Sequence, residues 1–494
     1  MSAEDEIRKE RVKKLAILKE AGMDAYPVSV DRDYTVVEFI SRFESLNTDQ
    51  STVALVGRIM SLRGQGGIMF AELYDGSTSL AAGGTDRTQA VFQKDMMDEN
   101  DYLLFERAVD VGDFVQVSGI PFITKRGTQS LQVKHWKMVS KALLPIPDAH
   151  FGLKDEEKIL RERYLDILLN KDIRDMFIRR AKFWAVVRNY YLEHGFLEVE
   201  TPVFQSSPGG ADARPFLTHH NALDIDVYLR IAIELPQKKL LVAGFPRVFE
   251  IGRIFRNEGQ SREHLQDYTQ IESYEAYGNM RTGMRFIQDL YRKIALDVYG
   301  KYTFEINGHT VDLANEWSEV DYCERIKSEF GLDPLTCSES EAIACAHNAG
   351  VLGHGEDGNM TRAIDLLWKK IRKSITGPAF LIGLPTYMEP LAKSDPQNPA
   401  VVERFQVLIA GSEMGKGFSE LNDPLDQRAR FEEQEKLRAA GDDEAQRLDL
   451  DYIRAMEYGM PPAFGFGMSE RLFSFLENRP AHETQIFPLL RPKE

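Results

Sequence analysis

The chain has 494 residues, 43% of them hydrophobic and 28% charged, which is typical of a globular protein with two to four domains and ample core. The formal net charge of −16 argues against a protein whose whole surface binds nucleic acid, although a local basic patch stays open. Three cysteines, Cys323, Cys337 and Cys345, fit neither a disulfide framework nor a zinc-ligand spacing. Because the thiols suit a reducing compartment and no apolar run suits a signal or a membrane span, we expect a cytoplasmic protein that does not enter the membrane.

The first 145 residues are expected to form one domain. Residues 4–22 predict an amphipathic, locally basic helix that ends at Gly22, and its basic side chains suit either solvent or RNA. Between residues 52 and 139, short runs of alternating hydrophobic residues are separated by glycines and polar turns, which predicts a small β-barrel. The stretch LPIPD at 144–148 predicts a linker, so a second domain is expected at 146–494.

The second domain is expected to mix helices and strands. Helical patterns cover 156–169, 172–194 and 279–299. The later segments are a helix-rich stretch at about 301–376 that holds all three cysteines, strands at 379–389 and 405–409, and a helical stretch at 428–458.

Residues 247–274 predict a β-hairpin that presents polar side chains to one site. Side chains two apart in a strand share a face, so Arg256 and Glu258 are expected to point the same way. The return strand presents four more side chains on one face: Tyr268, Gln270, Glu272 and Tyr274. A guanidinium fork suits a phosphate, and an aromatic ring suits a flat group such as a base. The alternative is a polar hairpin with a surface ion pair between Arg256 and Glu258.

Several motifs resemble those of a known family. FRNEG at 255–259 resembles the second signature motif of the class II aminoacyl-tRNA synthetases, GFLEVETP at 195–202 the first, and GFGMSER at 465–471 the third. SPGGADARPFLTHHNALD at 207–224, GFSELNDP at 417–424 and the terminal FPLLRP resemble the lysine-specific members of subclass IIb. The resemblance covers nearly the whole chain.

The resemblance implies an α+β fold and a two-step reaction. An N-terminal OB-fold that binds the tRNA anticodon would precede an antiparallel-sheet catalytic domain, with helices on its outer side and a helical insertion at about 301–376. The carboxylate of L-lysine would attack the α-phosphorus of ATP, giving lysyl-adenylate and pyrophosphate. The lysyl group would then pass to the 3′ end of tRNA(Lys). The segment between Gly195 and Pro202 would form the interface of a homodimer.

The resemblance also assigns residues to the reaction. Arg256 and Arg471 would be catalytic, and Mg²⁺ would assist them. The ATP-binding residues would be Arg256, Glu258, His264, Tyr268, Glu413 and Arg471. The metal ligands would be Glu413 and Gln406. In the barrel, Phe70 would stack on an anticodon base and Gln89 would hydrogen-bond one, with core packing as the alternative for Phe70.

The lysine site implied by the resemblance is rich in carboxylates. Its residues would be Gly210, Glu234, Arg256, Glu272, Tyr274, Phe418, Glu420 and Asn422. Glu234 would bind the α-ammonium, and Glu420 with Tyr274 would bind the ε-ammonium. An ammonium in a closed pocket needs such anionic partners, because unpaired burial costs several kcal/mol.

Several positions depart from the family's pattern. Gln406 is neutral where the family carries a metal-binding glutamate. Lys416 replaces an asparagine, and Glu389 replaces a serine. The third motif has one extra residue before Arg471, which predicts a bulge or a shifted turn, and residues 81–88 predict an insertion between barrel strands.

Two other functions compete with this one. The first is an enzyme that attaches lysine or β-lysine to a protein, but such relatives lack the N-terminal OB domain that this chain is expected to carry. The second is a non-catalytic RNA-binding homologue, which the altered third motif and metal positions favour.

Overall fold

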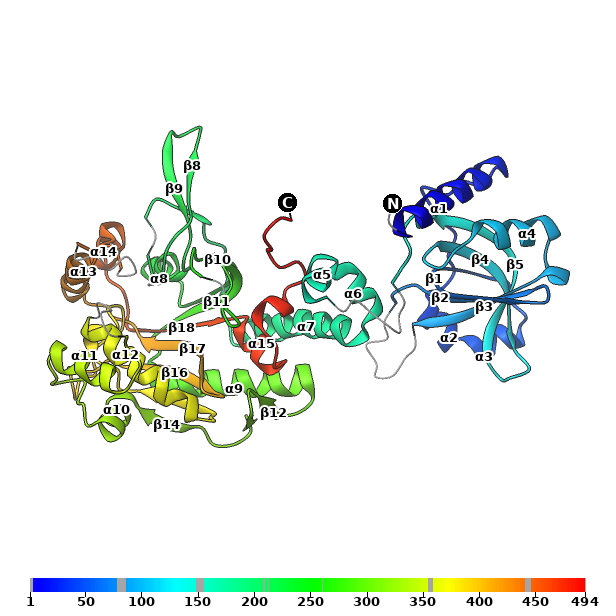
Figure 1. Ribbon diagram of the computed structural model, residues 1–494. Helices are drawn as coiled ribbons and strands as arrows, with labels where there is room; N and C mark the ends of the chain where they lie inside the picture. Colours follow the sequence, from blue (N-terminus) through cyan, green and yellow to red (C-terminus); the bar gives the residue numbers. More distant parts are fainter. Residues whose placement is uncertain are drawn as a thin grey trace. The chain divides into compact units, whose positions relative to one another are not determined.

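The computed structural model describes residues 3–77, 86–147, 155–207, 209–211, 213–259, 261–353, 359–439 and 446–493. The chain divides into two compact units, Met1–Lys154 and Asp155–Glu494, each with its own hydrophobic core (Figure 1). Most of the insertion predicted at 81–88 lies outside the described residues, as do Pro208 and Asp212 of the motif at 207–224.

The first unit is a closed five-stranded barrel with helices around it, as predicted. The strands follow each other in the order β1-β2-β3-β5-β4, and β4 pairs with β1 to close the barrel. Its elements are α1 (Ala3–Glu20), α2 (Val36–Ser41), α3 (Phe43–Thr48), β1 (Val53–Gln65), β2 (Ile68–Tyr74), β3 (Arg87–Gln93), α4 (Glu99–Ala108), β4 (Phe114–Ile123) and β5 (Gln129–Ser140).

Helix α1 is fastened to the barrel by one of its basic residues. Arg11 is buried and donates hydrogen bonds to the carbonyl oxygens of Val111, Ala142 and Leu144, each with a donor–acceptor distance of 3.0 Å. The helix ends as predicted, because Gly22 adopts a φ of 76°, which favours glycine. At least one of the basic side chains of α1 therefore serves the fold.

The second unit is built on an eight-stranded sheet of order β14-β15-β16-β17-β18-β11-β10-β6. The pairs β14–β15 and β10–β6 are parallel and the others antiparallel. Its strands are β6 (Leu197–Glu198), β10 (Arg247–Phe255), β11 (Asp267–Ala276), β14 (Ser318–Asp321), β15 (Ala379–Ile382), β16 (Arg404–Ile409), β17 (Ser412–Ser419) and β18 (Ala463–Ser469). This α+β architecture confirms the predicted fold class.

Helices cover both faces of this sheet. α9 lies beneath β16, β17 and β18, and α8 lies above β10 and β11 (Figure 1). The helices are α5 (Glu156–Arg161), α6 (Arg163–Leu169), α7 (Lys171–Glu193), α8 (Glu234–Val242), α9 (Met280–Tyr299), α10 (Tyr322–Phe330), α11 (Glu339–Asn348), α12 (Met360–Ile371), α13 (Pro424–Ala439), α14 (Leu450–Glu457) and α15 (Arg471–Leu476). Within the described ranges, none of the helices is long and apolar enough to cross a membrane.

Small strands complete the second unit. β7 (Phe204–Gln205), β8 (Leu217–His220) and β9 (Ile225–Leu229) form a three-stranded sheet, and β12 (Thr303–Ile306) pairs with β13 (His309–Asp312). The stretch at 301–376 was predicted to be helix-rich, which holds for α10, α11 and α12. The prediction is wrong for the first part of this stretch, which forms strands instead of helices. β12 and β13 form a hairpin, and β14 joins the main sheet beside β15.

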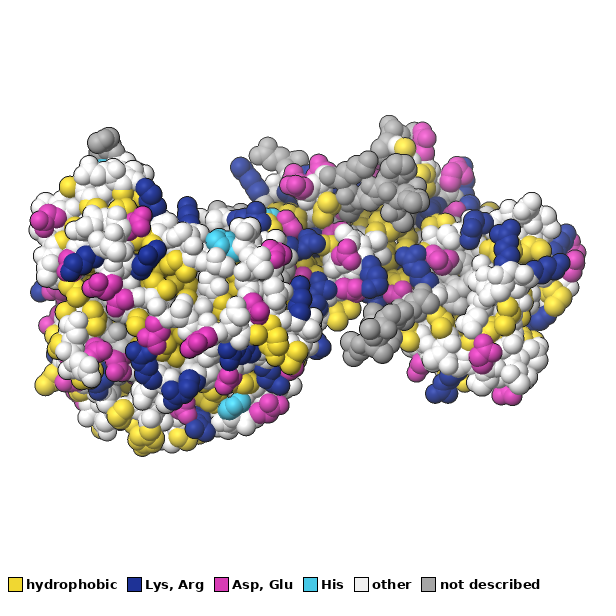
Figure 2. Space-filling model, turned by 90° about the horizontal axis from the view of Figure 1, so that it is seen from below, with side chains coloured by type: hydrophobic (Ala, Val, Ile, Leu, Met, Phe, Trp, Pro, Cys, Tyr) yellow, Lys and Arg dark blue, Asp and Glu magenta, His cyan; other side chains and the backbone are white. Residues whose placement is uncertain are grey.

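The surface mixes the two signs of charge. On the face drawn in Figure 2, Lys and Arg side chains are interspersed with Asp and Glu side chains. The net charge of −16 is thus carried in part by a mixed surface, which suits solubility.

A buried ion pair supports the strand that leads into the candidate site. Arg230 follows β9, and its Nη1 lies 2.5 Å from Oε1 of Glu250 on β10, with both side chains 4% exposed. Arg230 Nε also donates to the carbonyl oxygen of Arg253, and its Nη1 donates to that of Thr201. One guanidinium therefore holds three segments together where β10 ends.

Replacing Arg230 should loosen this region. Arg230→Met leaves the Glu250 carboxylate buried without its cation, which should cost about 3 to 5 kcal/mol. Hydrogen exchange of peptides from residues 247–276 in the full chain measures the loss. Arg253→Ala is the control, because Arg253 pairs with Asp267 at the surface of the same hairpin and should cost less than about 1 kcal/mol. Equal protection in both variants would contradict the prediction.

Candidate active site

A cavity of about 1940 Å³ lies in the second unit against the sheet. It is lined by strands β11, β17 and β18, by the start of α8 and by α12. This one cavity is lined by most of the site residues that the sequence predicted. They are Gly210, Glu234, Arg256, Glu258, His264, Tyr268, Glu272, Tyr274, Gln406, Glu413, Phe418 and Arg471.

Strand β11 supplies one wall of the cavity, and its alternation is as predicted. Tyr268, Gln270, Glu272 and Tyr274 all face the cavity, while Ile271 between them enters the core. The Glu272 carboxylate accepts hydrogen bonds from Gln270 Nε2 (2.5 Å) and from the Tyr274 hydroxyl (3.2 Å). Burial, assisted by the nearby Glu234, raises the pKa of Glu272 to about 7.

Arg256 and Glu258 reach the cavity by a different route from the one predicted. Strand β10 ends at Phe255, so both residues lie in the loop beyond it and the strand alternation does not apply to them. The Arg256 guanidinium lies 5.7 Å from the centre of the Tyr268 ring, and its Nε donates to the carbonyl oxygen of Ile231 over 3.3 Å. Both residues line the cavity.

Arg471 opens helix α15 at the edge of the cavity. Its Nη1 donates to the carbonyl oxygen of Glu413 over 3.3 Å, and its Nη2 pairs with the Glu263 carboxylate. β18 pairs with β11 and β17 without a register shift, so the pairing shows no bulge before Arg471, and Glu470 then turns the chain into α15. Burial and the neighbouring Arg471 lower the pKa of His264.

Two predicted lysine-binding carboxylates lie around a buried ammonium. Lys238 Nζ is 2.5 Å from Oε1 of Glu234 and 2.5 Å from Oε2 of Glu420, and its side chain is 0% exposed. Glu420 does not line the cavity but lies directly behind Gly465, which does. A Cβ at residue 465 would lie 2.0 Å from Oε1 of Glu420, so only glycine lets this carboxylate pack against β18.

Gly210 and Asn422 had been assigned to the same lysine site. Gly210 has a φ of 84°, and a Cβ there would lie 3.0 Å from the Glu234 Cβ, so glycine is required. Asn422 is a correction, because its side chain accepts from Lys393 Nζ (2.7 Å) and donates to the Met460 carbonyl oxygen (3.2 Å), away from the cavity.

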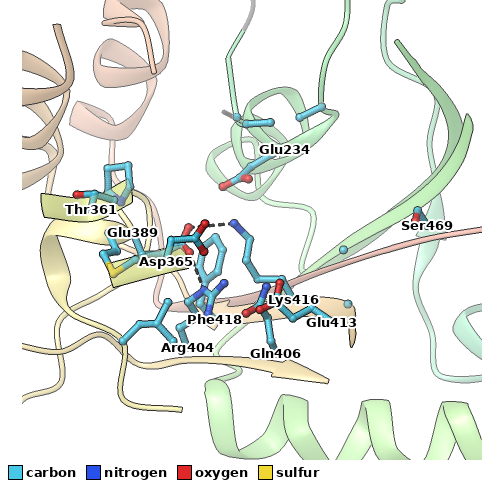
Figure 3. A pocket seen from close by; sticks show the side chains of 18 of the residues that line it. Glu234, Thr361, Asp365, Glu389, Arg404, Gln406, Glu413, Lys416, Phe418 and Ser469 are labelled. Atoms are coloured by element: carbon cyan, nitrogen blue, oxygen red, sulfur yellow. Dashed lines mark hydrogen bonds and ion pairs between the residues drawn. The ribbon is translucent and has the colours of Figure 1, made fainter. Parts of the chain in front are cut away.

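The departures at 389 and 416 meet in the cavity wall. Lys416 Nζ lies 3.0 Å from Oε1 of Glu389, and Arg404 Nε lies 2.6 Å from its Oε2. Figure 3 shows Lys416 directed at Glu389, with Glu234 across the cavity. Burial would raise the pKa of Glu389, but Lys416 and Arg404 together hold it below its usual value.

The predicted metal ligands lie on neighbouring strands. Gln406 on β16 is paired with Lys416 on β17, and Glu413 is the second residue of β17. Trp368 Nε1 donates to Oε1 of Glu413 over 2.8 Å, which orients the carboxylate. One carboxylate and one amide oxygen fit a magnesium ion that takes its remaining ligands from phosphates and water. Among the described residues, no group of three or more His, Cys, Asp and Glu could hold a metal by itself.

Phe70 and Gln89 lie on the first unit, on the outside of the barrel. Phe70 alternates with the buried Met69 and Ala71 and is itself only half-buried, so core packing does not explain it. Gln89 on the adjacent strand β3 is also half-buried and donates to Ser130 Oγ over 2.9 Å.

Sequence reasoning missed several residues of the site. Lys238 could have been found from its spacing of four residues after Glu234, which places both on one helix face. Glu389 and Arg404 carried no such signal, because they meet Lys416 only through the fold.

Comparisons with known proteins agree with this geometry. Residues 155–491 match the family model described as tRNA synthetases class II (D, K and N), and residues 53–139 match the OB-fold nucleic acid binding domain. The chain is 40% identical to the lysine–tRNA ligase of Halalkalibacterium halodurans, with 98% of this chain and 96% of the relative covered. It is 39% identical to that of Oceanobacillus iheyensis (97% and 97%) and 37% identical to that of Thermotoga maritima (99% and 97%). With its catalytic unit matched almost from end to end, the chain belongs to the class II tRNA synthetases of the D, K and N group.

Proposed function

We propose that this chain is a lysine–tRNA ligase, which activates L-lysine with ATP and transfers it to tRNA(Lys). The observation that carries the proposal is the cavity that holds Arg256 beside the buried carboxylates Glu234 and Glu272, with Glu420 behind its wall. Such a site suits an amino acid with two ammonium groups and one carboxylate. The full-length similarity to proteins named lysine–tRNA ligase supports the same activity.

The first step needs alignment and charge neutralisation more than covalent help from the protein. Arg256 donates to the lysine carboxylate and to the α-phosphate, which holds the attacking oxygen against the phosphorus. A carboxylate oxygen then forms the new bond to phosphorus as pyrophosphate leaves with the electron pair of the broken bond. Tyr268 stacks on the adenine, Glu258 accepts from its amino group, and Arg471 covers its other face.

The remaining groups orient the substrates. His264 contacts the outer phosphates. Glu413 and Gln406 would hold magnesium, which would offset the negative charge of those phosphates. Glu234 with the backbone at Gly210 binds the lysine α-ammonium.

The far end of the lysine side chain meets a closed, largely buried site. Glu272, Tyr274 and Glu420 bind the ε-ammonium, and Phe418 packs on the aliphatic chain. Removal of a carboxylate here should weaken lysine binding more than ATP binding.

The proposal also covers tRNA binding and the formation of a homodimer. The outward Phe70 and Gln89 contact the anticodon, and the edge strand β6 with residues 195–202 joins two copies of the chain. Leu197 on β6 is 47% exposed, which suits an interface. We place the protein in the cytoplasm on the basis of its reduced cysteines.

A ligase that acts on a protein is the second candidate, and the OB-fold at 53–139 disfavours it. Lysine-dependent exchange of pyrophosphate into ATP tests for activation, and the addition of purified tRNA(Lys) or of protein acceptors then separates the two enzymes. Without any exchange, a non-catalytic homologue would replace both.

Arg256→Ala should abolish exchange while the fold stays intact. The loss of its charge-assisted contacts should raise the barrier by about 3 to 4 kcal/mol, a factor of roughly a hundred to a thousand in rate. Arg253→Ala, on the same hairpin but outside the cavity lining, is the matched control. Near-normal exchange by Arg256→Ala would remove Arg256 from the proposed mechanism.

Glu420→Gln should raise the KM for lysine at least about tenfold and change the KM for ATP little. The reason is that the neutral amide cannot offset the ε-ammonium, a loss of about 1.4 kcal/mol or more. Glu275→Gln is the control, because Glu275 on β11 pairs with Arg247 and does not line the cavity. Equal increases for both substrates would place Glu420 outside the lysine site.

Phe70→Ala should weaken tRNA charging and leave lysine-dependent exchange unchanged, because base stacking is worth roughly 1 to 3 kcal/mol per base. Phe114→Ala is the control, since Phe114 is another half-buried ring of the barrel, stacked against Arg58. Both variants are compared for the KM of tRNA(Lys). An unchanged KM in Phe70→Ala would exclude a stacking role.

A further inference from the structure

Lys238 is a lysine whose whole side chain is enclosed by the protein. It lies on α8, and its Nζ is 2.5 Å from each of two carboxylates, Glu234 on the same helix and Glu420 just after β17. Three rings surround the ammonium, with Phe418 at 5.2 Å and Tyr274 and Tyr452 at 5.9 Å from ring centre to Nζ. The catalytic steps above do not use this residue.

The Lys238 ammonium lies between two carboxylates, Glu234 and Glu420. In the proposed function, these two carboxylates bind opposite ends of the lysine substrate. Glu234 begins α8 and lines the cavity, whereas Glu420 is 1% exposed and neither of its oxygens has a hydrogen bond of good geometry among the described residues. Glu420 therefore has acceptor capacity left over after its pairing with Lys238. Glycine at 465 lets this carboxylate and the Tyr274 ring pack against the strand that lines the cavity, because a Cβ there would overlap both.

The charged residues around Lys238 carry a net negative charge that a substrate has to offset. Glu234, Glu272 and Glu420 supply three negative charges when ionised, and Lys238 supplies one positive charge. Two negative charges are left for the substrate, and L-lysine carries two ammonium groups. The substrate carboxylate is not included in this sum, because Arg256 lines the same cavity and offsets its charge.

We propose that Lys238 is a specificity-determining counter-cation, which offsets one of the three pocket carboxylates and so sets to two the number of positive charges that the pocket takes from its amino acid. This inference rests on the proposed lysine-binding function and adds a residue to it. In the absence of Lys238, a proton or a third cation would have to take its place, because an unpaired buried carboxylate costs several kcal/mol.

The free pocket should hold protons that lysine displaces. Burial, with Glu234 as a like-charged neighbour, raises the pKa of Glu272 to about 7 and that of Glu420 to about 8, even though Lys238 and Lys416 act in the opposite direction on Glu420. Burial would lower the pKa of Lys238 itself, but Glu234 and Glu420 outweigh it and keep the ammonium charged. The other titratable groups that face this cluster, Tyr274 and Tyr452, have raised pKa values through burial and stay neutral.

The sign of the pH dependence follows from these shifts. Bound ammonium groups favour ionised carboxylates. Below pH 7 to 8, lysine must therefore displace the protons held by Glu272 and Glu420, whereas above this range the carboxylates are already ionised. The dissociation constant for lysine in the wild type should therefore fall by on the order of 10- to 100-fold from pH 6.5 to pH 8.5. Loss of Lys238 raises the pKa of Glu420 further, which moves this dependence to higher pH.

The test is calorimetric titration of the full chain with L-lysine and, separately, with ATP between pH 6.5 and pH 9. Lys238→Met keeps the length and apolar stem of the side chain and removes its charge. At pH 7.5 its dissociation constant for lysine should rise by at least about tenfold, and the deficit should shrink toward pH 9, with ATP binding unchanged. Lys239→Met is the matched control on the same helix, because Lys239 is partly exposed and pairs with Asp451 outside the cavity.

The outcomes separate three cases. Lysine binding with a wild-type pH profile, or a loss of equal size at every pH, would show Lys238 to be a packing residue only and would overturn the inference. If Lys238→Met also loses ATP binding, Lys238→Gln is judged by the same criteria, and loss of both ligands in both variants would likewise overturn it. Failure of the wild type to bind lysine at any pH would instead overturn the proposed function.

Discussion

The site depends on one physical constraint, which is that buried carboxylates must be offset by positive charge. Glu234 and Glu272 come from a helix and a central strand and line the cavity, and Glu420 follows another strand and lies behind Gly465 of the cavity wall. Bringing several like charges out of water is unfavourable unless cations join them. Lys238 supplies part of that charge permanently, and the remainder is a requirement that the substrate has to meet. Selectivity for a diamino acid thus arises because the positive charges of the protein do not fully offset the negative charges of the pocket.

The sheet makes this concentration of charge possible because strand geometry is rigid. Alternation on β11 directs Glu272 and Tyr274 to the cavity while Ile271 fills the core. Glycines in β18 let the strands and the carboxylates approach closely, since a Cβ at Gly465 would overlap both Glu420 and the Tyr274 ring. The buried pair of Arg230 and Glu250 then fixes the end of β10, from which the loop bearing Arg256 departs.

Much of this could be predicted from the sequence, and the failures have physical causes. The face formed by Tyr268, Glu272 and Tyr274 was predictable because a strand has a period of two residues. The reasoning for Arg256 failed in its mechanism, because β10 ends one residue earlier and the loop, not the strand, directs the side chain. Asn422 was misplaced because its side chain contacts Lys393 and Met460, which lie far from it in the sequence. The full role of Lys238 depends on a contact between α8 and Glu420 that local periodicity does not contain.

The unusual residues at 389 and 416 fit the same electrostatic rule. A lysine at position 416 by itself would add a positive charge near the pocket and weaken its demand for a cationic substrate. The structure pairs Lys416 with Glu389, and the two opposite charges add nothing to the net charge of the site. Arg404 on the neighbouring strand completes the solvation of Glu389, which lets this carboxylate stay ionised although it is buried. The charges of Lys416 and Glu389 therefore compensate each other, and the carboxylates around Lys238 keep their surplus of negative charge.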